Sequence, residues 1–399
     1  MIKNERLLIL ILATIQFTHI VDFMIMMPLG KQFMELFDIT PQKFTLLVSS
    51  YAFAAFLAGL VGALFIDRFD RRHALLVLYV GFIIGTLACA VAPTYGFFLA
   101  ARAFTGAFGG TLGGLSLAVI GDVVPFERRG KAVGQIMIAF SAASIVGVPV
   151  GIFLASAFGT QAPFFIIGSL SVLFFGLAFF VIPPLRSHLH QENGQNVHTS
   201  PADVFRLVRD SPNQRRALLF SLVLILGHFS IVPFIAPYLQ LNIGFSQNQV
   251  ALLYAIGGLV TVFCLPFFGW LADRYGHIRI FTIASVGALV SIFAITNLPP
   301  VALPVALVVA ASFFMVASGR NVPATTLVTS VVKPENRGSF MSIRQSANEA
   351  GLALSSFIAG LLIVENPDGS LGHYQHVGYF AIAMSILAIF LARRLRSVS

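Results

Sequence analysis

Three polar side chains recur at helical spacing inside an apolar stretch near the start of the chain. Gln16, His19 and Asp22 stand three residues apart, and their neighbours are almost all hydrophobic. Side chains three or four residues apart share one face of an α-helix. An acid in apolar surroundings can exchange a proton when its environment changes, and an imidazole or amide beside it can bind a polar ligand. The stripe therefore predicts proton coupling or substrate binding at Asp22, with His19 and Gln16 beside it.

The composition indicates that lipid surrounds this stripe. The chain has 399 residues, of which 57% are hydrophobic and 10% charged, with a mean hydropathy of +0.88. Soluble domains carry about 25% charged residues. The net charge of +9 comes from short basic clusters between apolar runs, a pattern that indicates membrane topology and not a nucleic-acid site. Cys89 and Cys264 lie in apolar runs without metal-ligand spacing, so we expect them to be small core residues.

Twelve apolar runs are long enough to cross a bilayer as α-helices, which takes about 20 residues each. They cover residues 7–29, 44–66, 75–92, 96–121, 132–157, 162–183, 217–241, 249–272, 280–297, 301–328, 339–364 and 374–392. We expect an all-α membrane protein with a six-helix bundle in residues 1–184, a cytoplasmic linker in 185–216 and a second bundle in 217–399. In the linker, SPADVFRLVRDSP at 200–212 predicts either a short helix on the membrane surface or a flexible connection.

The basic residues predict the orientation in the membrane. With twelve spans, both chain ends and the loops after even-numbered spans share one side, which holds twenty of the 25 lysines and arginines. The opposite side holds Lys31 and Lys43, while Arg102, Arg320 and Arg344 lie inside spans. An excess of positive charge marks the cytoplasmic side. We therefore expect both termini in the cytoplasm and the protein in a bacterial inner membrane.

The two sets of six spans repeat each other. HIVDFMIMMP from His19 resembles HFSIVPFIAP from His228, FIDR resembles LADR, and VVPFERRG resembles VVKPENRG, at offsets of 206 to 209 residues. Duplicated transporters place their substrate site between the halves near the middle of the membrane. The shared histidine is either a packing relic or a functional group. Asp22 aligns with Ile231, so its acid belongs to one half alone, which predicts an acquired function.

Two pairs of opposite charges are expected at matching depths inside the membrane. Charges there are costly unless they face a partner or a cavity. Counted from the nearest charged loops at about 1.5 Å per residue, Asp22 and Arg102 both lie in the outer-middle part of the membrane. Glu349 and Arg320 also lie at similar depth, and a structural pair and a functional pair are both open there.

Loop and helix motifs add a family resemblance. GWLADRYGHIR at 269–279 and ALFIDRFDRR at 63–72 are similar to the loop motif G-x-L-A-D-R-x-G-R-K, although the first copy lacks two of its glycines. In the fourth span, Arg102 and Gly106 match the pattern R-x-x-x-G. Through these motifs the chain resembles the major facilitator superfamily, and within it the twelve-span drug–proton antiporters with their sugar-efflux-like members.

The resemblance implies two pseudo-symmetric six-helix bundles that export small organic molecules by proton-coupled alternating access. It also implies a charge network in the cytoplasmic loops that steadies the outward-facing state. The network residues are Asp67, Arg68, Arg71 and Asp122, with Asp273 and Arg274 in the second copy. In the fifth span, Gly147, Pro149 and Gly151 resemble the antiporter motif, and a proline between glycines bends a helix. This bend is the candidate pivot for alternating access.

Three other functions stay open. A proton-coupled symporter importing a sugar or metabolite, a lysolipid transporter, and a membrane receptor or scaffold all fit the composition. The sequence has no nucleophile beside a base, no phosphate-binding loop and no metal-ligand spacing, so we expect no enzyme, no catalytic residue, no cofactor and no metal. The expected partners are a small-molecule substrate, protons and membrane lipid, without nucleic acid, and we expect a monomer.

Overall fold

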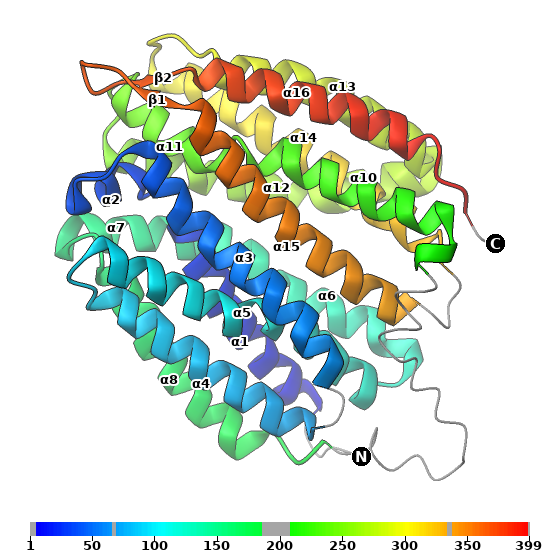
Figure 1. Ribbon diagram of the computed structural model, residues 1–399. Helices are drawn as coiled ribbons and strands as arrows, with labels where there is room; N and C mark the ends of the chain where they lie inside the picture. Colours follow the sequence, from blue (N-terminus) through cyan, green and yellow to red (C-terminus); the bar gives the residue numbers. More distant parts are fainter. Residues whose placement is uncertain (1–4, 66–68, 186–207, 333–336, 398–399) are drawn as a thin grey trace.

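The protein is described by a computed structural model that covers residues 5–65, 69–185, 208–332 and 337–397. The chain is almost entirely helical and folds into two bundles (Figure 1). The predicted linker helix at 200–212 lies mostly outside the described residues, which resume with a helical turn at 208–210.

The N-terminal bundle contains six membrane-crossing segments that follow the predicted apolar runs. They are α1 (Glu5–Ile25), α3 (Pro41–Phe65), α4 (Arg71–Ala90), α5 (Tyr95–Val123), a segment of three joined helices, and α8 (Ala162–Val181). The joined helices are α6 (Phe126–Ala142), the π-helix η2 (Ala143–Gly147) and α7 (Val148–Phe158), and the short helix α2 (Gly30–Phe37) precedes α3. Thr94 caps α5, because its hydroxyl accepts a hydrogen bond from the backbone N–H of Phe97.

The C-terminal bundle repeats this plan. Its segments are α10 (Pro212–Phe229) continued by α11 (Val232–Leu241), α12 (Gln247–Tyr275), α13 (His277–Thr296), α14 (Leu303–Thr329), α15 (Arg337–Leu362) and α16 (Tyr374–Ala392). Ser246 and Gln249 form a reciprocal capping box at the start of α12. A two-stranded antiparallel hairpin, β1 (Val364–Glu365) and β2 (Leu371–Gly372), connects α15 to α16 and was not predicted.

The predicted spans and the observed helices agree to within a few residues at most ends. Within the described residues, eleven helical segments are long and apolar enough to cross a membrane. The twelfth, α15, has 26 residues but is more polar in its first half, where Arg344, Gln345, Asn348 and Glu349 lie. The all-α fold with two six-helix bundles is thus confirmed, and the most polar predicted span is the one that packs along α3.

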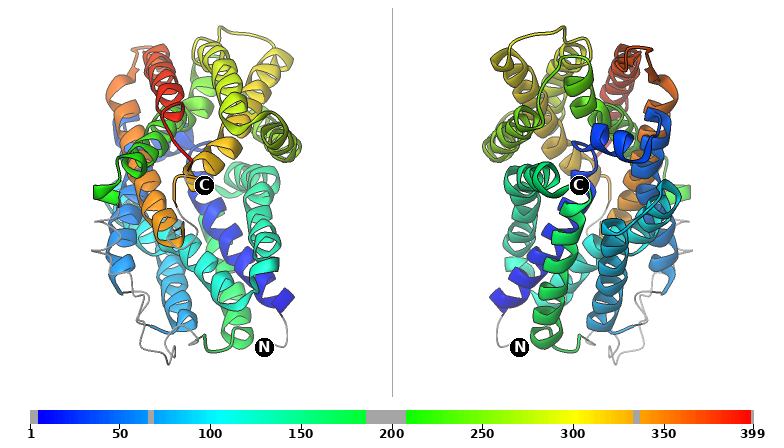
Figure 2. Two further views of the ribbon diagram at one scale, coloured as in Figure 1. Left: turned by 90° about the vertical axis from the view of Figure 1, so that its right-hand side faces the viewer. Right: turned by 90° about the vertical axis from the view of Figure 1, so that its left-hand side faces the viewer.

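The hydrophobic core is shared at one end of the molecule and divided at the other. At the end away from the chain termini, a single cluster joins both bundles and includes Ile25 and Phe33 from one, and Phe234 and Tyr374 from the other. Toward the termini the cores separate, and each cluster lies within one bundle. A small cluster of Ala52, Leu352 and Ala353 continues the contact between α3 and α15 toward the termini. The largest contact between the bundles is thus at the end opposite the termini, and Figure 2 shows the C-terminal bundle largely above the N-terminal one.

Polar contacts between the bundles gather at that same joined end. The side-chain amide of Gln42, on α3, donates a hydrogen bond to the carbonyl oxygen of Ile363 at 2.6 Å. Gln247, at the start of α12, donates to the carbonyl oxygen of Ile152 on α7 at 3.2 Å. The most extensive helix packing between the bundles is that of α3 against α15 and of α7 against α12. At this end, hydrogen bonds to backbone carbonyls join the two bundles in addition to the apolar packing.

The fifth span carries an irregular turn where the glycine and proline motif predicted a bend. The π-helix η2 ends at Gly147, and Pro149 lies in the first turn of α7. Proline lacks an N–H and clashes with the carbonyl four residues earlier, and an extra residue in the turn relieves both problems. A Cβ on Gly147 would overlap Val21, and one on Gly151 would lie 2.5 Å from Ile25. The two glycines therefore let α1 pack closely against this span.

Candidate functional site

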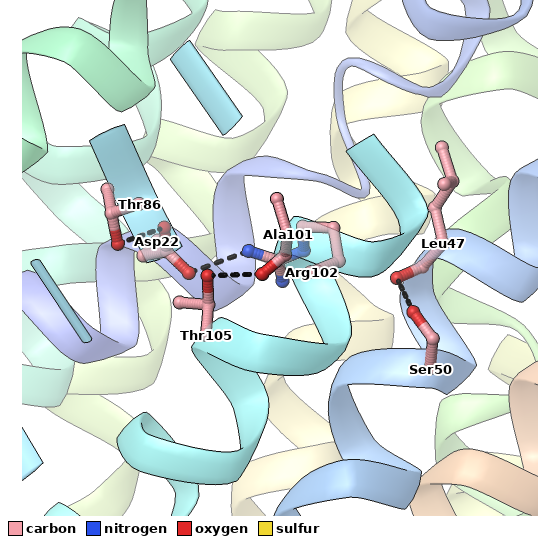
Figure 3. Close-up of polar contacts among 7 residues, drawn as sticks. All are labelled: Asp22, Leu47, Ser50, Thr86, Ala101, Arg102 and Thr105. Carbon is pink, nitrogen blue, oxygen red and sulfur yellow. Dashed lines mark hydrogen bonds and ion pairs between the residues drawn. The ribbon is translucent and has the colours of Figure 1, made fainter. Parts of the chain in front are cut away.

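The predicted proximity of Asp22 and Arg102 is confirmed, because the two form a buried ion pair. Arg102 Nη1 donates to Asp22 Oδ2 at 2.7 Å, and both side chains are 0% exposed. The hydroxyl of Thr86, on α4, donates to the other carboxylate oxygen at 3.1 Å. Figure 3 shows the guanidinium reaching from α5 to the carboxylate on α1. Three helices of the N-terminal bundle are thus tied together at one acid.

An aromatic ring and a close helix contact complete the surroundings of Arg102. Its guanidinium carbon lies 4.4 Å from the centre of the Tyr51 ring and 5.9 Å from that of Phe164. Such cation–π contacts strengthen when the cation is desolvated. A Cβ on Gly106 would overlap the carbonyl oxygen of Tyr51. The R-x-x-x-G pattern therefore has a physical role, since the glycine lets α3 approach and bring Tyr51 over the arginine.

Gln16 and His19 extend the polar row along α1, against glycines of α5. A Cβ on Gly109 would lie 3.0 Å from His19 Cδ2, and one on Gly113 would lie 3.0 Å from Gln16 Nε2. Both ring nitrogens of His19 and the Oε1 atom of Gln16 are buried without a hydrogen-bond partner among the described residues. Buried polar atoms of this kind usually bind internal water. The row leads from Asp22 toward the end where the cores are divided.

The histidine of the second repeat also lies beside a buried arginine. Arg320, on α14, donates to Ser385 Oγ at 3.1 Å and approaches His228 Nδ1 at 3.4 Å. Because a guanidinium can only donate, Nδ1 must accept, and His228 is then neutral. The His228 ring stacks on Phe313 with centres 5.3 Å apart. Ile231, which aligns with Asp22, is fully buried and supplies no charge here.

The expected pair between Arg320 and Glu349 is not formed. Glu349 accepts a hydrogen bond from Gln345 Nε2, on the same helix, at 2.9 Å. Its helix, α15, packs against α3, whereas Arg320 extends between α10 and α16. The prediction compared depths along the helices, and depth does not say which side of a helix a residue occupies. That side depends on how α14 and α15 pack in the bundle.

Part of the predicted loop network is present in the structure. Arg71 Nε lies 3.1 Å from Asp122 Oδ2, which joins the start of α4 to the end of α5. Asp70 caps α4 and also accepts from the backbone N–H of Leu185 at 3.0 Å. Asp70 stands where the motif has its second glycine, and in this chain that position is the N-cap of α4. Asp67 and Arg68 fall outside the described residues, so their share of the network stays a prediction.

The second copy of the loop motif makes contacts of a different kind. Asp273 lies 3.8 Å from His277 Nε2, one turn further along the chain. The guanidinium of Arg274 lies over the ring of Trp270 at 5.4 Å. Both contacts stay within this loop and its flanking helices. These contacts do not support the network role predicted for Asp273 and Arg274, which stays a prediction.

Two residues of the site were missed by the sequence analysis. Thr86 and Tyr51 both sit in apolar spans, where threonine and tyrosine are common and carry no charge. A usable sign existed for Tyr51, because Gly106 and Gly109 of α5 predict a bulky partner on a neighbouring helix. Thr86 offered no comparable sign, and its role shows only in the hydrogen bond from its hydroxyl to Asp22. Only the packed structure shows which residues fill such spaces.

Comparison with known proteins gives one consistent result. The family model described as Major Facilitator Superfamily matches residues 12–319 and 217–399. The chain is 27% identical over 376 residues to the Bacillus subtilis MFS-type transporter YwfA, covering 92% of this chain and 87% of that protein. A probable sugar efflux transporter of Mannheimia succiniciproducens is 26% identical over 220 residues, 54% of this chain and 53% of that one.

Solved structures show the same fold at low sequence identity. A D-xylose–proton symporter has a TM-score of 0.79 at 16% identity and covers 98% of this chain and 97% of its own. The nucleoside transporter NupG has a TM-score of 0.74 at 16% identity, covering 97% and 99%. At such identity these likenesses concern the arrangement of helices alone.

Proposed function

The chain belongs to the major facilitator superfamily of transporters, and from that premise we propose that it exports small organic molecules in exchange for protons by alternating access. The observation that carries the proposal is the ion pair of Asp22 and Arg102, at 2.7 Å and 0% exposure. An ionisable residue inside a membrane span marks a substrate or ion pathway. A proton arriving at Asp22 would neutralise one partner of the pair and leave Arg102 charged, which would loosen the joint between α1 and α5.

The unpartnered row on α1 supports a route for that proton. His19 and Gln16 lie one and two turns before Asp22 on α1 and carry buried polar atoms without partners in the described chain. Water held by these groups would connect Asp22 with the divided end of the molecule. In this proposal Asp22 is the coupling acid, Arg102 adjusts its charge state, and His19 and Gln16 relay the proton.

The divided core supports alternating access. We propose that the divided end, with both termini, faces the cytoplasm of a bacterial inner membrane, as the basic residues predict. The structure would then represent an inward-facing state, sealed on the outer side by the shared core. Cysteine at position 397 should react with an impermeant reagent only in inverted vesicles. Labelling of this cysteine from the outside of intact cells would contradict the proposed orientation.

The fifth span and the loop pair supply the moving parts of the proposal. Gly147, Pro149 and Gly151 place an irregular turn between α1 and α12, where one bundle can rock on the other. Arg71 and Asp122, with Asp67 and Arg68, would steady the outward-facing state. The Arg71 to Asp122 contact joins two helices of one bundle, so any state dependence must come through the residues of the loop between α3 and α4.

Export is favoured over import by a name among the relatives. The Mannheimia succiniciproducens protein is called a probable sugar efflux transporter, whereas the D-xylose–proton symporter is similar in fold alone. Inverted vesicles separate the two directions. With the interior made acidic, an exporter accumulates its substrate in the vesicles, while a proton symporter expels it.

Proton release on ligand binding tests the coupling role of Asp22. A thermal-shift screen at acidic and alkaline pH first provides a ligand, which is then added to purified protein in weakly buffered detergent. The wild type should release protons, and Asp22→Asn should not. Asp38→Asn makes the same chemical change in an exposed left-handed turn that asparagine tolerates, and it should behave as the wild type. Proton release by Asp22→Asn at the wild-type level would place coupling elsewhere, with Glu349 examined first.

A further inference from the structure

One buried arginine of the C-terminal bundle has no acid to balance it. Arg320 is 2% exposed, and its hydrogen bonds go to the neutral groups of Ser385 and His228. Its Nε atom is buried without a partner. Within the described part of the chain, no carboxylate lies within ion-pair distance of this guanidinium, which remains charged at any physiological pH. An uncompensated buried charge is strongly destabilising, so a negative group from outside the chain would be favoured beside it.

A second arginine of the same bundle is also unbalanced but more accessible. Arg344, on α15, donates from Nε to Ser221 Oγ at 3.2 Å and from Nη2 to Thr325 Oγ1 at 3.3 Å. It is half-buried, and no described carboxylate pairs with it. An arginine that anchors a helix end turns toward water or lipid headgroups. Arg344 turns instead to hydroxyls on α10 and α14, which places its charge inside the bundle.

The nearby acid does not neutralise either arginine. Glu349 accepts from Gln345 on its own helix and forms no ion pair with a described arginine. In the N-terminal bundle, Asp22 balances Arg102, but the aligned position holds Ile231. Arg102 and Arg320 are not aligned in the repeat, so the second bundle has its own cation and lacks the matching acid. Among the described residues, the arginine charge inside the N-terminal bundle is therefore neutralised by Asp22, whereas Arg320 and Arg344 leave a net positive charge inside the C-terminal bundle.

The two cations lie along one path from the divided end of the molecule. Arg344 contacts Ser221, which precedes His228 by seven residues on α10, so the two guanidinium groups are separated by about 10 Å along that helix. Thr325, which accepts from Arg344, and Asn321, which follows Arg320, are both exposed on α14. Polar side chains exposed within a membrane span face water and not lipid. An anion entering between the bundles would meet Arg344 first and feel the charge of Arg320 beyond it.

We propose that the C-terminal bundle binds an oxyanion of the transported molecule, a carboxylate or a phosphate, with Arg344 as the contact residue and Arg320 as the deeper cation that attracts it. This proposal rests on the transport function and names the substrate class for it. A guanidinium fork flanked by hydroxyl groups suits both oxyanions, which accept two parallel hydrogen bonds from arginine. The hydroxyls of Ser221 and Thr325, now accepting from Arg344, can rotate and donate to the bound anion.

Binding of matched anionic and neutral compounds tests the proposal. Purified full-length protein is titrated by thermal shift with gluconate, inorganic phosphate and glucose, at constant ionic strength set by a chloride salt. Gluconate or phosphate should raise the melting temperature in a saturable way, and glucose should not. Gluconate alone would identify a carboxylate site, and phosphate alone a phosphate site. Absence of a saturable shift with both anions, or an equal shift with glucose, would overturn the proposal.

Variants show whether the arginines carry the binding. Arg344→Gln should weaken anion affinity about tenfold or more, the effect of losing one charge-assisted contact. Arg320→Gln should weaken it less, and Arg279→Gln, the same change at an exposed arginine in the first turn of α13, should leave it unchanged. Wild-type affinity in Arg344→Gln would reject the site even if anions bind. These titrations use no pH gradient, so their failure would leave proton coupling at Asp22 standing, and failure of proton release would leave the anion site standing.

Discussion

Removing Asp22 alone should cost more stability than removing both partners of the Asp22–Arg102 pair. Loss of one partner of a buried ion pair typically costs about 3–5 kcal/mol, whereas apolar replacement of both partners is often neutral. No solvent discount applies, because both side chains are 0% exposed. Asp22→Asn keeps hydrogen-bonding capacity toward Thr86 and Arg102, so we expect the lower limit, about 3 kcal/mol. The guanidinium left behind cannot neutralise itself by losing a proton.

The reverse deletion should be milder. In Arg102→Met, the carboxyl group of Asp22 can take up a proton and still accept from Thr86, so we expect about 2 kcal/mol at neutral pH and less in acid. The double variant Asp22→Asn/Arg102→Met buries no charge, and we expect a loss of about 2 kcal/mol. The coupling free energy of the cycle is then about 3 kcal/mol, the excess of the two single losses over the double loss.

A thiol-reactive dye provides the unfolding assay. Cys89 is 0% exposed and reacts only when the N-terminal bundle opens, and Cys264 is replaced by alanine in every variant. Unfolding is followed in increasing concentrations of sodium dodecyl sulfate. The surface pair of Lys31 and Glu35, at 3.6 Å, is the control cycle and should give under about 1 kcal/mol. A coupling below about 0.5 kcal/mol for Asp22 and Arg102 would mean additive behaviour and would refute the assignment of a tight, desolvated pair.

Two further predictions concern helix contacts. Gly106→Ala should lower the free energy of unfolding by about 1–3 kcal/mol in the same assay, because the new methyl group meets the backbone of Tyr51 and cannot displace it. The control Gly114→Ala has open space around it and should be neutral or slightly stabilising. Equal losses in the two variants would contradict the close contact. The double variant Gln42→Ala/Gln247→Ala removes two hydrogen bonds to backbone carbonyls between the bundles at the joined end. Spin labels placed on the two bundles at that end should therefore move apart, while labels at the divided end approach each other. Unchanged distance distributions would show that these bonds do not hold the conformation seen in the structure.

The sequence predicted the helices well because lipid imposes a simple rule. A spanning helix must be long and apolar, and this length is visible without knowing its neighbours. The predicted final span, 374–392, has the same bounds as α16. The weak case was α15, whose polar first half is covered by packing against α3. Burial by another helix replaces burial in lipid there, and hydropathy cannot show that exchange.

The site was predictable in its charges and not in its connections. Asp22 and Arg102 could be matched because both are rare in such spans and lie at equal depth. The same reasoning failed for Arg320 and Glu349, since it had no information on helix rotation. Tyr51, which lies over Arg102, was unpredictable by charge because its contribution comes from a ring face and the approach allowed by Gly106. Depth follows from counting residues, whereas direction follows from the packing of the whole bundle.

The π-turn in the fifth span has a consequence for how this sequence can change by insertion and deletion. One π-turn holds about one residue more than an α-helical turn, so it is what a single-codon insertion leaves in a helix that keeps its two ends in place. Deleting one residue from Ala143–Gly147 should therefore turn this segment into a continuous α-helix and leave Gly151 facing Ile25. The π-turn gives the span one residue that it can lose while α7 keeps the surface that meets α1.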